Sequence, residues 1–154
     1  MPDRPVDYEV VLEQASARQL AAVRGTSPSA SELGPVIIRL LDQVWPLLRT
    51  QSTPTGHNVV VYYGGPTTIA AGVEVFGPFE PTAQVEALST PAGEVVRTTH
   101  WGEYSAMRPA YVALDAWFAT HDRAPAGVSW EVYGDWAESA ADRRTDIYFL
   151  VRPA

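Results

Sequence analysis

The same pattern of residues occurs twice in the chain, and each copy opens an amphipathic segment. In the first copy, Ser31 and Pro35 precede a stripe of apolar residues at helical spacing. Ser105 and Pro109 repeat this pair with the same separation and open a second stripe. Both serines are expected to be N-caps, and both prolines fall in the first turn, where proline is tolerated. The sequence therefore predicts two long helices, at about 31–49 and 105–121.

The remaining sequence is typical of short β-strands separated by tight turns. Apolar and β-branched residues cluster or alternate in eight short runs, with glycine and proline between them. Pro46 is expected to kink or end the first helix near its last turn. The predicted strands are 8–14, 18–25, 58–63, 69–76, 84–89, 94–101, 128–133 and 146–151.

Further matches between the two parts of the chain favour an internal duplication. Tyr63-Gly64 matches Tyr133-Gly134 at an offset close to that of the helices, which sets Val61 against Glu131. The ends of the two last strands match at a similar offset. Each half then consists of a strand, a helix and two strands. The alternative is a chance similarity between two amphipathic helices.

The packing of these elements predicts the architecture. Helices with one apolar stripe cover one face of an antiparallel sheet, which is an α+β arrangement. We expect a single domain over 1–154, made of halves at about 8–80 and 81–154 that are related by pseudo-twofold symmetry. A ligand cleft is expected between the halves, because pockets favour such interfaces.

Charge and composition exclude several classes of function. The formal net charge is −7 and the 11 basic residues, all arginine, are scattered, so no basic face for nucleic acid is indicated. An acidic protein should instead favour cationic ligands. The absence of cysteine excludes disulfides and thiolate chemistry. The three histidines are far apart and no common catalytic motif occurs, so we expect no metal and no cofactor.

Hydropathy gives an expectation about location. No apolar run approaches the about 20 residues that a membrane span needs. Residues 1–5 lack the basic start and apolar stretch of a signal peptide. A cytoplasmic protein without membrane association is therefore expected.

The segment 128–136 is the most informative part of the sequence for chemistry. If it forms a strand, Val128, Trp130 and Val132 face one side, and Glu131 and Tyr133 face the other. A carboxylate beside a phenol, among aromatic rings, is suited to a cationic aromatic ligand through charge and cation–π attraction. The alternative is a glutamate on the solvent face of an antiparallel sheet, which is a common arrangement.

Several short motifs follow one another in the second half. A Gly102-Glu103-Tyr104 sequence precedes the helix, aromatic residues lie along that helix, and Glu131-Val132-Tyr133 follows it. The last strand ends near Pro153. In this order and spacing, the chain resembles the GyrI-like small-molecule-binding family, the effector-binding domain of bacterial multidrug-responsive transcription regulators. It departs from the family pattern at Glu103, where proline is common, and at Arg152, where an apolar residue is common.

The resemblance implies a duplicated fold with a central aromatic cleft that binds bulky, often cationic, lipophilic compounds. By position, Glu131 is the acid that meets the ligand, with Tyr133 beside it. The other expected lining residues are Trp101, Tyr104, Met107 and Tyr111, while the internal repeat adds Tyr63. Met107 and Tyr111 have the alternative of belonging to the helix core.

Three functions are compatible with these residues. The first is a stand-alone protein that senses or sequesters cationic aromatic compounds and does not itself bind DNA, since no helix-turn-helix segment precedes the repeat. The second, drawn from the resemblance, is a hydrolase of cyclopropane-containing DNA-alkylating compounds, in which Glu131 orients or activates water. The third, also drawn from the resemblance, is a gyrase inhibitor, for which the acid-rich stretch 135–142 is a candidate surface.

Overall fold

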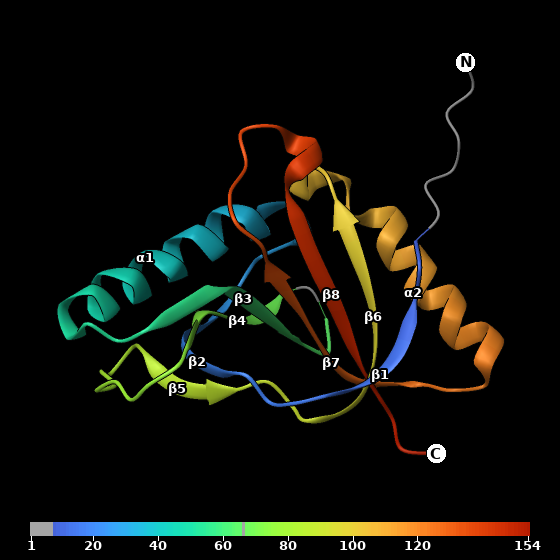
Figure 1. Cartoon of the computed structure of the whole chain (residues 1–154), viewed down its shortest axis with the longest axis horizontal. Coiled ribbons are helices and arrows are strands. Elements are labelled where there is room, and N and C mark those ends of the chain that lie inside the picture. Colours follow the sequence, from blue (N-terminus) through green and yellow to red (C-terminus); the bar gives the residue numbers. More distant parts are fainter. Residues whose placement is uncertain (1–7, 66) are drawn as a thin grey trace.

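Eight antiparallel strands form one sheet, and two long helices pack on it (Figure 1). The structure is a computed structural model and describes residues 8–65 and 67–154. The expectations about residues 1–5 lie outside the described residues. The helices are α1 (Leu33–Gln51) and α2 (Arg108–His121). The strands are β1 (Val11–Ala15), β2 (Gln19–Thr26), β3 (Thr55–Tyr63), β4 (Thr68–Val75), β5 (Glu86–Ser89), β6 (Gly93–Trp101), β7 (Pro125–Tyr133) and β8 (Arg144–Val151).

The helix starts differ from the prediction. A short 3-10 turn precedes each helix, η1 (Ala30–Glu32) before α1 and η2 (Tyr104–Ala106) before α2. Ser31 and Ser105 lie inside these turns, and neither helix has a side-chain cap. Of the two effects predicted for Pro46, the end of the helix is wrong, because α1 continues to Gln51, and the kink stays a prediction.

The sheet order, β1-β6-β8-β7-β3-β4-β2-β5, confirms the duplication. The unit β2-α1-β3-β4 has its counterpart in β6-α2-β7-β8, and the two units meet at the central pair of β3 with β7. The outer strands are exchanged, since β1 of the first half pairs with β6 and β5 of the second half pairs with β2. This is the expected α+β fold with pseudo-twofold symmetry.

Two short connections force the sheet to curl. β1 and β2 are consecutive in the chain but stand six places apart in the sheet, and so do β5 and β6. In a flat sheet six strand spacings would be about 29 Å. The links at 16–18 and 90–92 span at most about 15 Å even when extended. The links also bond to each other, since Thr90 N donates to Arg18 O over 3.0 Å. The curl closes on the face away from the helices, which is therefore concave, because Ala15 of β1 and Leu20 of β2 pack there in one core.

The two faces of the sheet carry separate cores. On the helix face, α1 packs over β2 and β4, while α2 packs over β6. On the concave face, the sheet packs against itself around Trp130, which is stacked on Tyr148 with ring centroids 5.5 Å apart. Gly72 of β4 allows this close packing, because a Cβ there would lie 2.4 Å from Ala21 O.

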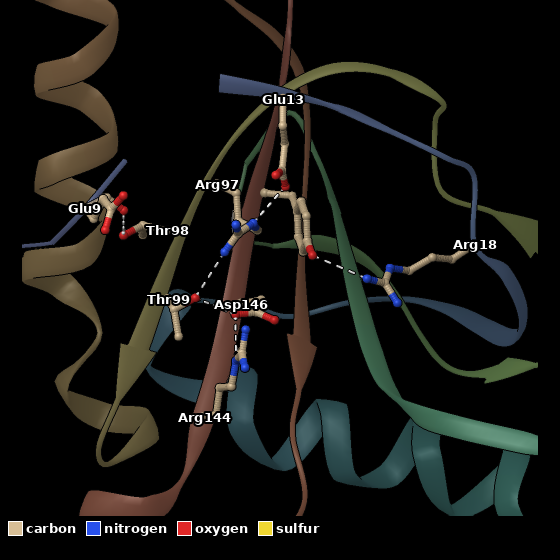
Figure 2. A network of polar contacts seen from close by, with 9 residues as sticks. Glu9, Glu13, Arg18, Arg97, Thr98, Thr99, Arg144 and Asp146 are labelled. Atoms are coloured by element: carbon tan, nitrogen blue, oxygen red, sulfur yellow. Dashed lines mark hydrogen bonds and ion pairs between the residues drawn. The ribbon is translucent and has the colours of Figure 1, made fainter. Parts of the chain in front are cut away.

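Arginine–carboxylate pairs border the concave core. Arg97 donates to Glu13 over 2.7 Å, and Arg144 donates to Asp146 over 3.1 Å (Figure 2). Arg18 pairs with Glu74 over 2.9 Å and also donates to the hydroxyl of Tyr148. Each of these three carboxylates therefore has an arginine as its cationic partner.

Neither α1 nor α2 is long and apolar enough to cross a membrane.

Candidate functional site

Glu131 lies at the centre of the sheet and points to the helix face. Its neighbours in β7, Trp130 and Val132, belong to the concave core, as the alternation of the strand predicts. Because α1 covers β2 and β4 and α2 covers β6, the strands β7 and β8 lie between the two helices (Figure 1). The Glu131 side chain is only 3% exposed. The alternative of a glutamate on a solvent face is therefore wrong.

Three phenols surround the carboxylate. Tyr62 of β3 donates a hydrogen bond to Glu131 Oε1 over 2.9 Å. Tyr133 donates to the same oxygen, and Tyr111 of α2 donates to Oε2. The donors come from two strands and one helix, so the contacts join both halves of the molecule at this acid. Hydrogen bonds to a charged acceptor are the strong class, and three of them stabilise the ionised carboxylate in a buried place.

These contacts keep the phenols protonated. Burial raises the pKa of Tyr62, Tyr111 and Tyr133 well above the ordinary value of tyrosine, and the negative charge of Glu131 raises each of them further. The three hydroxyls therefore act as donors to Glu131 throughout the physiological pH range.

Glu131 has no cationic partner in the described part of the chain. No arginine or histidine nitrogen among residues 8–65 and 67–154 lies within 4.0 Å of its oxygens. An ionised carboxylate that is taken out of water is costly unless charge or hydrogen bonds compensate it. The phenols supply hydrogen bonds but no positive charge. The site therefore combines aromatic rings with a carboxylate that has hydrogen-bond donors but no cationic partner among the described residues.

The structure brings four of the predicted lining residues together. Glu131, Tyr133 and Tyr111 are joined by the hydrogen bonds above, and the ring of Tyr104 meets Tyr133 edge-on at 5.6 Å. Tyr104 is 39% exposed, so it lies at the border of the site. Met107 is partly buried and packs into the α2 core.

Trp101 and Tyr63 lie elsewhere. Trp101 is 57% exposed, on the other face at the end of β6, where the Arg144 guanidinium lies over its ring. There it lines a cavity of about 310 Å³ together with Arg97. Tyr63 packs on the concave core and carries the Arg24 guanidinium over its ring at 5.4 Å. Neither residue contacts Glu131.

Tyr62, which the sequence analysis did not single out, takes the place expected for Tyr63. In the pairing of β3 with β7, Val60 stands directly across from Glu131. A twofold axis perpendicular to a sheet keeps each side chain on its own face, so Val60, not Val61, is the counterpart of Glu131. The same alignment of the two strands matches Tyr62 with Tyr133. The alternation of faces in β3 is the signal that could have found it.

Phe149 is a second residue that the sequence analysis did not place in the site. Its ring lies 5.8 Å from Tyr111 and 6.2 Å from Phe118. It thus extends the aromatic wall of the site along β8 toward α2. Within the described residues, no three histidine or acidic side chains are grouped so that they could hold a metal ion.

Several solved structures of other proteins have the same fold as this chain. The C-terminal domain of EcmrR superposes with a TM-score of 0.75, over 96% of this chain and 99% of that domain, at 17% sequence identity. The chain has the GyrI-like fold. The same fold occurs in SAV2435 bound to tetraphenylphosphonium, with a TM-score of 0.63, 12% identity and coverage of 96% of this chain and 94% of that one. A hydrolase from Listeria innocua also has it, with a TM-score of 0.64, 9% identity and coverage of 94% and 92%.

Sequence comparison adds nothing to the structural match. No protein-family model and no curated protein matches the chain. At these low identities the similarity shows the GyrI-like fold alone.

Proposed function

We propose that this protein binds bulky, lipophilic, cationic aromatic compounds at Glu131, between α1 and α2. One observation carries the proposal. Glu131 is 3% exposed and accepts hydrogen bonds from three phenols, yet no described cationic side chain pairs with it. A ligand cation would supply the missing positive charge.

The rings around Glu131 suit the remainder of such a ligand. Tyr104, Tyr111, Tyr133 and Phe149 provide apolar area and π-faces within one continuous set of contacts. Aromatic burial supplies affinity, and a cation over a ring face adds electrostatic attraction. The carboxylate then distinguishes cations from neutral compounds, because a neutral ligand brings no positive charge to it.

The comparisons support the class of ligand. SAV2435, which has the same fold, is bound to tetraphenylphosphonium, a lipophilic cation with four aromatic rings. At 12% sequence identity the similarity to SAV2435 shows a common fold and not a common ligand. Tetraphenylphosphonium is therefore used here as a probe.

The test compares a cation with a neutral compound of similar shape. Calorimetry would measure the Kd of tetraphenylphosphonium and of triphenylphosphine oxide for the wild type and for Glu131→Gln. We expect the substitution to raise the Kd of the cation about 10-fold or more and to change the Kd of the neutral compound by no more than about twofold. Glu86→Gln, which removes an exposed acid of the Arg24 pair, is the matched control. Equal losses for both compounds would contradict the electrostatic role, and binding of neither would refute the site.

A hydrolase at the same site is the second candidate. It is favoured by the shared fold of the Listeria innocua hydrolase and by the phenol of Tyr111 on the second oxygen of Glu131. In that case Glu131 would orient or activate a water for attack on an electrophilic, strained ring of a bound compound. Chromatography of a cyclopropane-containing alkylating compound incubated with a tenth of an equivalent of protein separates the two. Loss of at most a tenth of the compound indicates a binder, whereas continued loss indicates turnover.

The gyrase interaction stays a prediction. Its candidate surface, 135–142, contains Trp136, over which the Arg143 guanidinium lies at 3.8 Å. Capture of gyrase subunits by the wild type, and loss of capture when the acids of this stretch are replaced, would support it.

A further inference from the structure

Thr145 of β8 carries a hydroxyl that has no partner. The residue is 0% exposed, and its Oγ1 makes no hydrogen bond within the described residues. Leaving a buried hydroxyl without a partner costs free energy, so a place of this kind calls for an explanation.

The strand register places this hydroxyl beside the Glu131 site. Thr145 pairs with Tyr133 on one side and with His100 of β6 on the other. It shares the helix face with both, because Ile147, two residues further along β8, belongs to the α2 core. Glu131 pairs with Ile147, so Thr145 is its diagonal neighbour, and the two residues are about 7–8 Å apart. One substituted aromatic ring spans a comparable length.

The polar side chains of the two residues paired with Thr145 already form hydrogen bonds with other groups. The hydroxyl of Tyr133 donates to Glu131. His100 is bonded at both ring nitrogens, by Tyr8 Oη at 2.7 Å and by Glu103 O at 2.9 Å. Because Glu103 contacts His100 and Tyr104 contacts Tyr133, the start of η2 spans the two neighbours of Thr145. The free hydroxyl therefore lies on the side of the site that this exposed segment borders.

Packing does not require a hydroxyl at this place. β8 is the counterpart of β4, and aligning the first residues of the two strands makes Ile69 the counterpart of Thr145. Ile69 is 1% exposed and belongs to the apolar core under α1. The polar groups thus accumulate in one half, since Val60 and Ile69 stand where the other half has Glu131 and Thr145. An aliphatic side chain of the same shape would fill the place of Thr145 without the cost of an unpaired hydroxyl.

We propose that Thr145 is a specificity-determining residue, whose hydroxyl bonds to a polar substituent on the aromatic body of a cation held at Glu131. The inference rests on the proposed function and narrows its ligand class. Preferred ligands carry a hydroxyl, amino or carbonyl group about one aromatic ring away from the cationic centre.

The test uses cations that differ by one hydroxyl. Calorimetry would compare tetraphenylphosphonium with its analogues in which one ring is 3-hydroxyphenyl or 4-hydroxyphenyl. For the wild type we expect one of the hydroxylated cations to bind about 2- to 10-fold more tightly than the parent. Thr145→Val should abolish this preference and change the Kd of the parent cation by no more than about twofold. Thr145→Ser, which keeps the hydroxyl, should retain the preference.

Two further outcomes separate this inference from the proposed function. If all three cations bind the wild type with no preference, or if Thr145→Val keeps the preference, the role of Thr145 is refuted and the site at Glu131 stands. If none of the cations binds, both the proposed function and this inference are refuted. Thermal unfolding of the free protein provides an independent check. Thr145→Val should raise Tm by about 2–6 °C if the hydroxyl is unpaired, whereas a fall in Tm would mean that it has a partner in the free protein.

Discussion

Glu131 stands directly across from Val60 where β7 pairs with β3, at the pseudo-twofold axis of the molecule. The acid and the aliphatic residue occupy the same position in the two halves of the fold. Around them the symmetry is kept, because Tyr62 and Tyr133 are counterparts and both donate to the same oxygen of Glu131. A symmetric pair of phenols therefore meets a charge that belongs to one half only, and Tyr111 of α2 adds a third phenol from that half. Such a site fits one cation per chain.

The two symmetry-related phenols should contribute comparably to the site. Tyr62→Phe and Tyr133→Phe each remove one hydrogen bond to a buried carboxylate and leave the ring in place. We expect each to lower the free energy of unfolding by about 1.5–3 kcal/mol, measured by urea denaturation. Because both phenols share one acceptor oxygen, the double variant should deviate from additivity.

Tyr63→Phe is the matched control for these variants. Tyr63 is adjacent in sequence to Tyr62, but it packs on the concave core and keeps its ring over Arg24 after the change. Its substitution should alter stability by less than about 0.5 kcal/mol. An effect of Tyr63→Phe as large as that of Tyr62→Phe would show that the contacts to Glu131 do not determine the result.

The elements of the fold were largely predictable from the sequence because they depend on local pattern. Helical stripes and strand alternation indicate α1, α2 and the eight strands, and the repeat indicates the symmetry. The predicted helix starts were wrong because Ser31 and Ser105 lie in the 3-10 turns η1 and η2, which precede the helices. A 3-10 turn and an α-helix share the same early sequence signals.

The site was predictable only in part, because its geometry depends on register. The alternation of β7 set Glu131 and Tyr133 on one face, and the resemblance added Tyr104 and Tyr111. A one-residue error in the repeat offset moved the expected site residue from Tyr62 to Tyr63, which points to the opposite face. The burial of Glu131 also needed the positions of both helices, which the sequence of one strand does not contain.

Alkaline pH should destabilise the protein through the buried phenols. The folded chain holds the pKa of Tyr62, Tyr111 and Tyr133 above the ordinary value of about 10, through burial first and the charge of Glu131 second. Their contribution to stability is thus complete below about pH 10. It falls as the pH rises further, because the unfolded chain then loses phenolic protons that the folded chain keeps. The expected slope is at most about 1.4 kcal/mol per pH unit for each tyrosine.

Ultraviolet titration of phenolate formation measures this effect. The sequence contains 7 tyrosines, and we expect the folded protein to leave the three at Glu131 unionised until it unfolds in base. The triple variant with phenylalanine at these positions should lose the late step, if it folds; otherwise the single variants should each reduce its amplitude. Ionisation of all tyrosines near pH 10 in the folded protein would contradict the buried arrangement.

The close packing of β4 on β2 should make Gly72 intolerant of a side chain. A Cβ at Gly72 would lie 2.4 Å from Ala21 O and 2.6 Å from the Cβ of Ala22, and the first of these is backbone that cannot turn away. Gly72→Ala should therefore cost about 1–3 kcal/mol or more in urea denaturation. Gly34→Ala is the control, because nothing lies within 4 Å of its Cβ and alanine favours a helix, so it should stabilise α1 by about 0.5–1 kcal/mol. Equal effects of both changes would argue against the tight contact.

Gly102 should couple the turn after β6 to the site. Its φ of +141° disfavours any side chain, and a Cβ there would lie 3.3 Å from His100 Nε2, the atom bonded to Glu103 O. Gly102→Ala should therefore cost about 1–3 kcal/mol of stability and displace the start of η2, which carries Tyr104. Because Tyr104 contacts Tyr133, we also expect tetraphenylphosphonium to bind about threefold or more weakly by calorimetry.

Gly127→Ala distinguishes backbone strain from an effect on the site. Gly127 has a φ of +93°, so alanine is strained there too, but nothing lies within 4 Å of its Cβ. It should lose stability as Gly102→Ala does and keep the wild-type Kd for tetraphenylphosphonium. If the two variants weaken binding to the same extent, strain in the fold accounts for the loss and the connection from Gly102 through Tyr104 to Tyr133 is refuted.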